Sequence, residues 1–521
     1  MRIGDCLTSN ALELPHSEAI VFKDRRITYA EYHRESDRAA AGMLARGVKK
    51  GDRVGIYLSS CPEFLFTYMA AAKIGAIAVP VSWRFTPKEV KFVLEDAGVS
   101  FLVMGEGFSG MDFIGTIQSL GGTIPSPDHI VLFGRERSLE GALRWDDLLS
   151  EPAASLDDAK AKVTGEDPVL FLYTSGTTGV PKAAVLTHKN LCSYAVGMMK
   201  ASGLEHGDAI LLNVPLNHVG GAVMAVMSAL AKGNKLVVMD SFVPEETLQV
   251  IERERVAVMG QVPAQYALEL LSPNVGTFNL GSIRIAIVSG QSCPPELISQ
   301  IKEKMGVLPR NAYGLTEVSG AITFTHPDHG PEKLQSTVGR PMEGIDLAIL
   351  DESGNTLPGG KVGEIAVRGE PVMKGYWRRD AENDIVFDRN GYLHTGDMGM
   401  LDKDGFLVMS GRKKEMYIRG GENVYPPEVE EVLTKHPDVL FCAVVGRPDS
   451  VMGEVGRAYV VLRPGASADT GSVRSFAAEH LAAYKVPVDV IFRDQLPFTP
   501  VGKVRKLDLY REIEEEFKRH R

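Results

Sequence analysis

The chain has 521 residues, more than a single hydrophobic core usually serves, so at least two domains are expected. Its 44% hydrophobic and 24% charged residues are ordinary for a globular protein, and a formal net charge of −10 argues against a general nucleic-acid binder. The five cysteines form no CxxC pair and no Cys/His cluster, which excludes the usual zinc and disulfide frameworks.

The N-terminus and the apolar runs predict a protein without a membrane span. Residues 1–15 lack the apolar core of a signal peptide. The apolar run at residues 219–230 is too short to cross a bilayer. Together with the scattered cysteines, these features favour a cytoplasmic location.

Helix and strand patterns alternate along the first part of the chain. In chain order, they predict a helix over 29–46, a strand over 53–58, a helix over 61–74, and strands over 76–81, 101–103, 129–133, 236–239 and 283–288. This alternation predicts a layered α/β fold with a largely parallel sheet. Residues 147–168 are polar and without a clear period, so we expect a surface connection there.

The central stretch, residues 173–190, reads YTSGTTGVPKAAVLTHKN and follows an apolar run, residues 169–172, with the length of a buried strand. One part of it contains only glycine and small hydroxyl residues: Thr174, Ser175, Gly176, Thr177, Thr178 and Gly179. The glycines allow backbone N–H groups to converge on an anion, and Lys182 adds a positive charge, so the stretch suits a polyphosphate. P-loop spacing does not fit, because Pro181 precedes the lysine and Ala183 follows it.

Three later motifs carry further candidate residues. Residues 311–317 read NAYGLTE, in which an aromatic beside glycine offers a flat face to a nucleobase. Thr316 and Glu317 suit one phosphate oxygen and one magnesium ion, because hard cations prefer oxygen ligands. Residues 392–397 read YLHTGD, and Asp397 could accept both hydroxyls of a ribose. Residues 287–295 read IVSGQSCPP and place small polar residues after a predicted strand.

In their spelling and order, these motifs closely resemble the adenylate-forming superfamily of acyl-CoA synthetases, peptide-synthetase adenylation domains and luciferases. The resemblance implies a large N-terminal domain of layered α/β sheets, residues 1–412, and a smaller mobile α+β domain, residues 413–521. In the smaller domain, helices are expected over 427–435 and 473–483 and strands over 441–445 and 458–462, after a last strand of the large domain over 405–409.

The resemblance also implies a reaction. The enzyme would activate an organic carboxylic acid with ATP to give acyl-AMP and pyrophosphate, then transfer the acyl group to CoA with release of AMP. ATP, Mg²⁺ and CoA are the expected cofactors, and a homodimer is the assembly that the family suggests. No nucleic-acid partner is expected.

Individual roles follow from the same resemblance. Lys503 is the expected adenylation lysine, acting with the catalytic residues Glu317 and Thr316, and Thr178 and Glu317 are the expected metal ligands. Lys414 is the expected pivot of the small domain. The ATP- and CoA-binding set comprises Thr174, Ser175, Gly176, Thr177, Thr178, Gly179, Lys182, Gly290, Gln291, Ser292, Asn311, Ala312, Tyr313, Gly314, Thr316, Asp397, Arg412, Lys414, Gly420, Gly421, Glu422 and Lys503.

The acyl pocket is expected beside His218, which the resemblance makes its gate, although a lone histidine among apolar residues more often has a structural role. Amino-acid-activating relatives place an aspartate nearby, and residues 213–221 contain none. The expected pocket residues are His218, Val219, Gly220, Gly221, Val262, Pro263 and Val318. Because they offer no charge partner, they favour a medium-chain, alicyclic or aromatic acid.

Some alternatives stay open from the sequence. The paired glycines at 420–421 could form only a tight turn. An acyl-AMP ligase that loads a separate carrier protein would not depend on free CoA. A non-catalytic nucleotide-binding or scaffold protein would not catalyse ATP–pyrophosphate exchange, and the joint presence of Glu317, Asp397, Arg412 and Lys503 argues against it.

Overall fold

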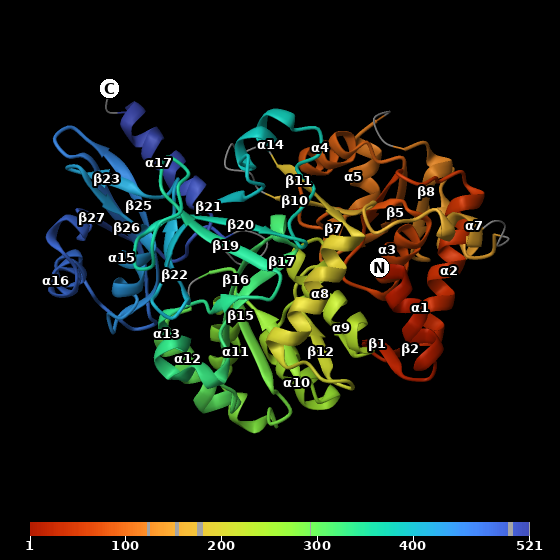
Figure 1. Ribbon diagram of the computed structural model, residues 1–521, viewed down its shortest axis with the longest axis horizontal. Coiled ribbons are helices and arrows are strands. Elements are labelled where there is room, and N and C mark those ends of the chain that lie inside the picture. The colour runs from red at the N-terminus through yellow and green to blue at the C-terminus, as the bar shows by residue number, and fades with distance from the viewer. Residues whose placement is uncertain (122–124, 152–155, 175–180, 292, 499–503, 520–521) are drawn as a thin grey trace.

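The computed structural model describes residues 1–121, 125–151, 156–174, 181–291, 293–498 and 504–519. Two large sheets and the helices between and around them form the main body, and two smaller sheets follow along the chain (Figure 1). The expected layered α/β architecture is therefore confirmed. None of the helices in the described ranges is both long and apolar enough to cross a membrane.

The first large sheet has seven strands and carries the central motif. Its order is β11 (Lys182–Thr187), β10 (Pro168–Thr174), β4 (Ile77–Pro80), β3 (Arg53–Tyr57), β5 (Phe101–Gly105), β8 (Ile130–Phe133) and β9 (Leu143–Arg144). Neighbours are parallel except for the β10–β11 hairpin. Helices cover both faces of such a sheet, so its central strands are aliphatic runs, and this is why the sequence indicated β3, β4, β5, β8 and β10. The edge strand β9 has only two residues, one of them an arginine, and was not indicated.

The second large sheet has nine strands, most of them parallel. Its order is β18 (Arg340–Pro341), β17 (Gly320–Phe324), β16 (Arg310–Leu315), β15 (Ile285–Ser289), β14 (Val258–Gln261), β12 (Ala209–Leu212), β13 (Lys235–Val238), β1 (Glu18–Phe22) and β2 (Arg25–Thr28). The N-terminal hairpin thus completes a sheet built mainly from residues 209–341, with Ile20 opposite Leu236. The strands expected over 236–239 and 283–288 correspond to β13 and β15.

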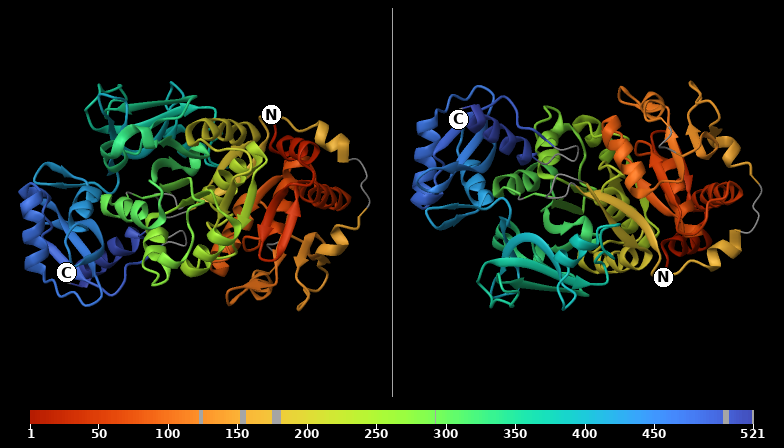
Figure 2. Two further views of the ribbon diagram at one scale, coloured as in Figure 1. Left: turned by 90° about the horizontal axis from the view of Figure 1, so that it is seen from below. Right: turned by 90° about the horizontal axis from the view of Figure 1, so that it is seen from above.

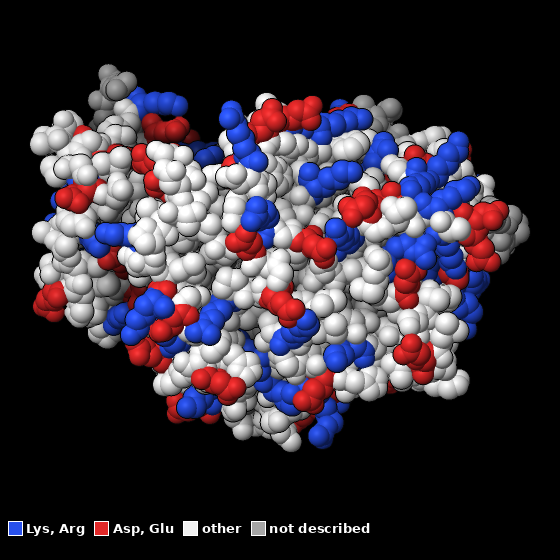
Figure 3. Space-filling view, in the orientation of Figure 1, with Lys and Arg blue, Asp and Glu red and all other residues white. Residues whose placement is uncertain are grey.

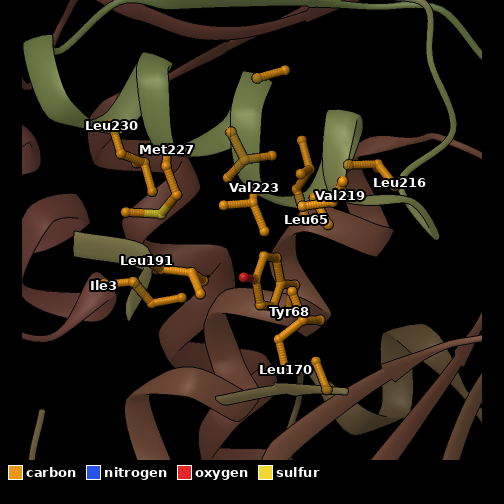
Figure 4. Packing of buried hydrophobic residues seen from close by; sticks show 14 of the residues in the cluster. Ile3, Leu65, Tyr68, Leu170, Leu191, Leu216, Val219, Val223, Met227 and Leu230 are labelled. Atoms are coloured by element: carbon orange, nitrogen blue, oxygen red, sulfur yellow. The ribbon is translucent and has the colours of Figure 1, made fainter. Parts of the chain in front are cut away.

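Helices between the sheets join them into one core. They are α1 (Ile3–Glu13), α2 (Tyr29–Ala45), α3 (Pro62–Ile74), α8 (His188–Ser202), the π-helix η2 (Gly220–Ala225) and α9 (Val226–Lys232). Every residue of α3 is buried, and the helix begins at Pro62, whose fixed φ suits a first helical turn. Figure 4 shows the buried side of η2 and α9 facing α3, with side chains from Leu216, Val219, Val223, Met227, Leu230, Leu65 and Tyr68.

The remaining helices of this part lie around the sheets. They are α4 (Pro87–Ala97), α5 (Phe113–Ser119), α6 (Trp145–Leu148), α7 (Leu156–Ala161), α10 (Pro244–Glu254), α11 (Pro263–Leu270), α12 (Pro295–Met305), α13 (Gly330–Ser336) and α14 (Asp380–Val386). The surface connection expected over 147–168 contains a short helix, α7, which the sequence did not indicate. No residue of that helix is fully buried, but Leu156 and Ala159 pack against the main core and Lys160 forms an ion pair with Asp37 at 2.9 Å.

Two smaller sheets complete the chain. The four-stranded sheet contains β19 (Ile345–Leu350), β20 (Gly363–Gly369), β21 (Leu393–Leu401) and β22 (Leu407–Arg412). The C-terminal unit contains β23 (Tyr417–Arg419), β24 (Glu422–Val424), α15 (Pro426–Leu433), β25 (Val439–Asp449), β26 (Gly453–Leu462), α16 (Thr470–His480), β27 (Asp489–Phe492) and α17 (Lys506–Arg519). It has hydrophobic clusters of its own and forms a separate lobe at one end of the molecule (Figure 2).

Candidate active site

The β10–β11 hairpin presents the central motif. Thr174 and Lys182 pair directly at the end of the two strands and flank the loop residues of the motif in the sequence. Ser175, Gly176, Thr177, Thr178 and Gly179 lie outside the described residues, and their phosphate-binding role stays a prediction. Lys182 is buried, and its Nζ lies 3.6 Å from Oε1 of Glu382 and 5.5 Å from the ring centre of Tyr376. The lysine is therefore held beside the loop by two groups from residues 376–382.

Residues 373–377 lie along β11 as an added extended segment. Lys374 N–H donates to the Val185 carbonyl, and Val185 N–H donates back to the Gly375 carbonyl, each at 2.9 Å. Tyr376, bridged to Ala184 at this edge, directs its hydroxyl to Oε1 of Glu317 at 2.7 Å. The contact joins the hairpin of the central motif to the expected metal ligand, and the sequence analysis did not single out Tyr376 for it.

Glu317 occupies a short 3₁₀ turn, Thr316–Val318, directly after β16. Its carboxylate is buried and accepts the Tyr376 hydroxyl, while its backbone carbonyl accepts the Met373 N–H at 2.7 Å. Burial, and next the Glu317 charge, raises the pKa of Tyr376, so the phenol stays a protonated donor. Thr316 is partly buried beside this carboxylate in the same turn.

Three predicted nucleotide residues meet in one cluster. Tyr313 in β16 donates its hydroxyl to Oδ2 of Asp397 in β21 at 2.8 Å, and Nε of Arg412 in β22 lies 3.1 Å from Oδ1. Asp397 and Arg412 are direct partners on antiparallel strands. Burial, and next the Asp397 charge, raises the pKa of Tyr313, and the same carboxylate raises the pKa of Arg412. We call these three residues the Asp397 cluster.

The neighbours of Tyr313 have packing roles. A Cβ at Gly314 would lie 1.9 Å from the Gly320 carbonyl oxygen, so the approach of β17 itself requires this glycine. Asn311 donates its side-chain amide to the carbonyls of Leu334 and Thr337, at 2.7 and 3.2 Å, and Ala312 is buried. Asn311 is thus held by backbone groups, and its predicted contact with ATP stays a prediction.

Residues after β15 are open to solvent. Gly290 has a φ of +85°, and Gln291 is exposed, so both lie at the surface where the strand ends. Ser292 lies outside the described residues. The predicted wall between adenine and acyl group stays a prediction at these three positions.

The expected acyl wall begins at the π-helix. His218 is partly buried and its Nδ1 accepts the Gly220 N–H at 3.2 Å, while a Cβ at Gly221 would lie 2.4 Å from the Pro215 carbonyl oxygen. π-helical turns are rare and frequently occur at functional sites. Val219 and Val318 are buried in the main core, whereas Val262 is partly buried next to Pro263, the first residue of α11. Their contact with an acyl group stays a prediction.

The turn after β22 and the first hairpin of the C-terminal unit hold the predicted pivot and CoA passage. Lys414 is exposed in the turn between β22 and β23. Gly420 and Gly421, with φ of +60° and +91°, form the two-residue turn between Arg419 of β23 and Glu422 of β24. The tight-turn interpretation is therefore confirmed for the backbone, and a CoA contact by this glycine hairpin stays a prediction. Lys503 lies outside the described residues.

Among the described residues, the expected Mg²⁺ site would have one protein carboxylate, Glu317. Across the described ranges, no three His, Cys, Asp or Glu side chains form a group that could hold a metal by itself. Mg²⁺ commonly uses one or two carboxylates together with substrate phosphates. Glu317, buried and oriented by one phenol, fits that kind of shared site.

A buried aspartate joined to a tyrosine and an arginine, and a separate small domain, agree with the adenylate-forming class that the motifs resemble. Comparisons with known proteins place the chain within that class. The model of the AMP-binding enzyme family matches residues 7–377, and that of the AMP-binding enzyme C-terminal domain matches residues 428–503. The chain belongs to the AMP-binding enzyme family and is an ATP-dependent, AMP-forming carboxylate–CoA ligase.

Relatives with known names agree with this placement. Feruloyl-CoA synthase of Amycolatopsis is 35% identical over 98% of both chains, and indoleacetate–CoA ligase of Aromatoleum aromaticum is 34% identical with the same coverage. The crystal structure of an anthranilate CoA ligase with anthranoyl-AMP superimposes with a TM-score of 0.92, covering 99% of this chain and 98% of that one at 27% identity.

Proposed function

We propose that the protein converts an uncharged aromatic, alicyclic or medium-chain carboxylic acid into its CoA thioester. The observation that carries this proposal is that residues 213–221, the segment of the expected acyl wall that leads into the π-helix, contain no Asp, Glu, Lys or Arg. A wall without a buried charge gives a charged acyl tail no partner, so an apolar tail is favoured. The names of similar ligases, for feruloyl and indoleacetate groups, support testing aromatic acids first.

In the first step, a carboxylate oxygen of the acid attacks the α-phosphorus of ATP and pyrophosphate leaves. The Asp397 cluster would hold the ribose, since Asp397 is a carboxylate that can accept its hydroxyls. Lys182 and the predicted Lys503 would offset phosphate charge, because phosphoryl transfer depends mainly on positioning and electrostatic stabilisation. Mg²⁺, when bound, supplies further charge neutralisation, and Glu317 and Thr178 would be its ligands from the protein.

In the second step, the CoA thiol attacks the acyl carbon and AMP leaves as a good leaving group. Room for the thiol arm requires Lys503 to withdraw, and rotation of the C-terminal unit about Lys414 would achieve this. The same rotation would bring the glycine hairpin to the site. Its exposed turn supports this role, since small residues let a slender arm pass close to backbone.

Pyrophosphate release with ATP and magnesium, measured across aromatic, alicyclic, aliphatic and dicarboxylic acids with and without CoA, tests the proposal. Turnover that needs both an uncharged acid and CoA supports it. Preference for dicarboxylic acids would contradict the uncharged wall. Release that stops after one equivalent until a carrier protein is added would favour the alternative, an acyl-AMP ligase that loads a separate carrier.

A further inference from the structure

A second cleft lies far from the candidate active site. It has a volume of about 830 Å³ and lies between β2, α2 and the segment from β8 to α6. These elements are at the end of the molecule opposite the C-terminal unit (Figure 1). None of its lining residues belongs to the candidate active site. The mechanism above therefore gives this cleft no role.

Arginines dominate the lining although the chain as a whole is acidic. The lining contains four carboxylates and six arginines. The arginines are Arg25, Arg26, Arg34, Arg38, Arg135 and Arg144. Figure 3 shows Lys and Arg side chains gathered on this end of the molecule, over α2 and β8. A local excess of positive charge on a protein of net charge −10 is a feature that needs a cause.

The carboxylates that line the cleft neutralise only part of the positive charge of its arginines. Glu31 accepts the backbone N–H and the hydroxyl of Thr28, at 2.8 and 2.9 Å, and so caps α2. Glu35 is shared by Arg34 and Arg38, each at 3.1 Å, and these arginine side chains remain 60% and 45% exposed. One carboxylate cannot satisfy two guanidinium groups with five N–H donors each.

The segment from β8 to α6, on the other side of the cleft from α2, also contains a weakly paired arginine. Arg135 forms a long ion pair with Asp146, at 3.6 Å, and its side chain is 89% exposed. Phe133 and Trp145 lie edge to face with ring centres 6.4 Å apart and form an apolar floor. Glu63, almost fully buried in the lining, pairs one oxygen with Arg25 and has no hydrogen-bond partner on the other within the described part of the chain. The cleft thus combines exposed arginines that are only partly paired, an apolar floor and one carboxylate oxygen without a partner among the described residues.

We propose that this cleft binds an organic phosphate. Arg34 and Arg38, one turn apart on α2, would grip the phosphate from one side and Arg135 from the other, because the planar guanidinium fork matches phosphate oxygens. The organic part would lie over Phe133 and Trp145, and a hydroxyl or amine on it would satisfy Glu63. The phosphate could belong to a free metabolite or to a lipid headgroup, since both present the same group.

The test is calorimetric titration of the full-length protein with inorganic tripolyphosphate at low salt and without Mg²⁺. Under the proposed function, wild type binds two equivalents, one at the active site and one here. Arg34→Ala/Arg38→Ala is expected to lose one equivalent, or to bind it at least about tenfold more weakly. Lys88→Ala/Lys91→Ala removes the same charge from α4, outside the cleft, and is the matched control. Equal binding by wild type and the arginine variant would overturn the site.

Flotation with phosphatidylcholine vesicles, with and without phosphatidic acid, identifies the source of the phosphate. Vesicle binding that needs phosphatidic acid and both arginines assigns the cleft to a headgroup, and loss of tripolyphosphate binding alone assigns it to a soluble phosphate. Acid-dependent pyrophosphate release should be unchanged in the arginine variant. Failure of the proposed function would instead remove that release from wild type, so the two failures are distinguishable.

Discussion

The Asp397 cluster and the glycine hairpin, which we propose serve one active site, are built in two different ways. The first is held by a buried carboxylate with a phenol at 2.8 Å and a guanidinium at 3.1 Å, on strands that pair directly. The second is an exposed two-residue turn in a separate lobe. A nucleoside must be held throughout both half-reactions, whereas a thiol arm must enter only for the second. Rigid support and open backbone match those different tasks.

The largest effect is expected from Asp397→Ala. The substitution removes the proposed ribose acceptor and leaves Tyr313 and Arg412 without their shared partner, so ATP–pyrophosphate exchange should fall about 100-fold. Asp346→Ala is a matched control. That carboxylate also accepts a tyrosine and an arginine, Tyr392 at 2.7 Å and Arg368 at 2.6 Å, but at an exposed position. Equal losses of exchange in both variants would mean that Asp397 contributes to general stability and has no specific role in binding ATP.

Tyr376→Phe tests whether the expected metal ligand belongs to the rigid part of the site. Losing the hydroxyl that orients Glu317 should raise the Mg²⁺ concentration for half-maximal exchange about tenfold, as loss of a metal ligand's outer hydrogen bond commonly does. Tyr392→Phe, which removes a phenol from exposed Asp346, should leave the Mg²⁺ dependence unchanged. An unchanged Mg²⁺ concentration for half-maximal exchange in Tyr376→Phe would argue against Glu317 as a metal ligand.

Gly421→Ala probes the open part. Nothing lies within 4 Å of the added Cβ, so the change acts only through the positive φ of +91° and should distort the turn at a cost of about 1 kcal/mol. CoA-dependent product formation should slow several-fold while ATP–pyrophosphate exchange stays normal. Gly405→Ala, with φ of +80° and equally open space, imposes the same strain in the large domain. Equal effects from both glycines would remove the special role of the hairpin.

The smallest effect is expected from Glu269, in the helix that begins at the predicted pocket residue Pro263. Glu269 of α11 accepts the Gln261 side-chain amide at 2.6 Å, and burial raises the pKa of Glu269 to about 8. The native state therefore retains a proton that the unfolded chain releases near its ordinary pKa. This contribution to stability is full at low pH and is lost as pH rises toward 8. Glu269→Gln should match wild type near pH 5 and exceed its Tm by a few degrees at pH 8 in thermal melts. A constant difference across this range would contradict the buried neutral acid.

The sequence indicated strands and motifs that a short stretch of residues carries, but it did not indicate contacts between residues far apart in the chain. Strands β3, β4, β5 and β8 are buried on both faces, so each appears as an aliphatic run, and the motif residues of the Asp397 cluster were identified one by one. The contact of Tyr376 with Glu317 joins residues 59 positions apart, and no spacing rule indicates such a partner. Helix α17 was missed as well, because its segment is highly charged and contains few apolar residues. Its buried residues are Leu509 and Ile513.

The N-terminal hairpin has a consequence for synthesis of the chain. β1 and β2 leave the ribosome early, but β1 pairs in parallel with β13, with Ile20 opposite Leu236. Until that distant strand emerges, the aliphatic edge of β1 has no neighbour on that side. Unpaired edges and long-range parallel pairing both slow folding and expose a nascent chain to aggregation. A chain truncated before residue 236 lacks β13, so we expect it to leave this edge of β1 unpaired and to yield an insoluble fragment.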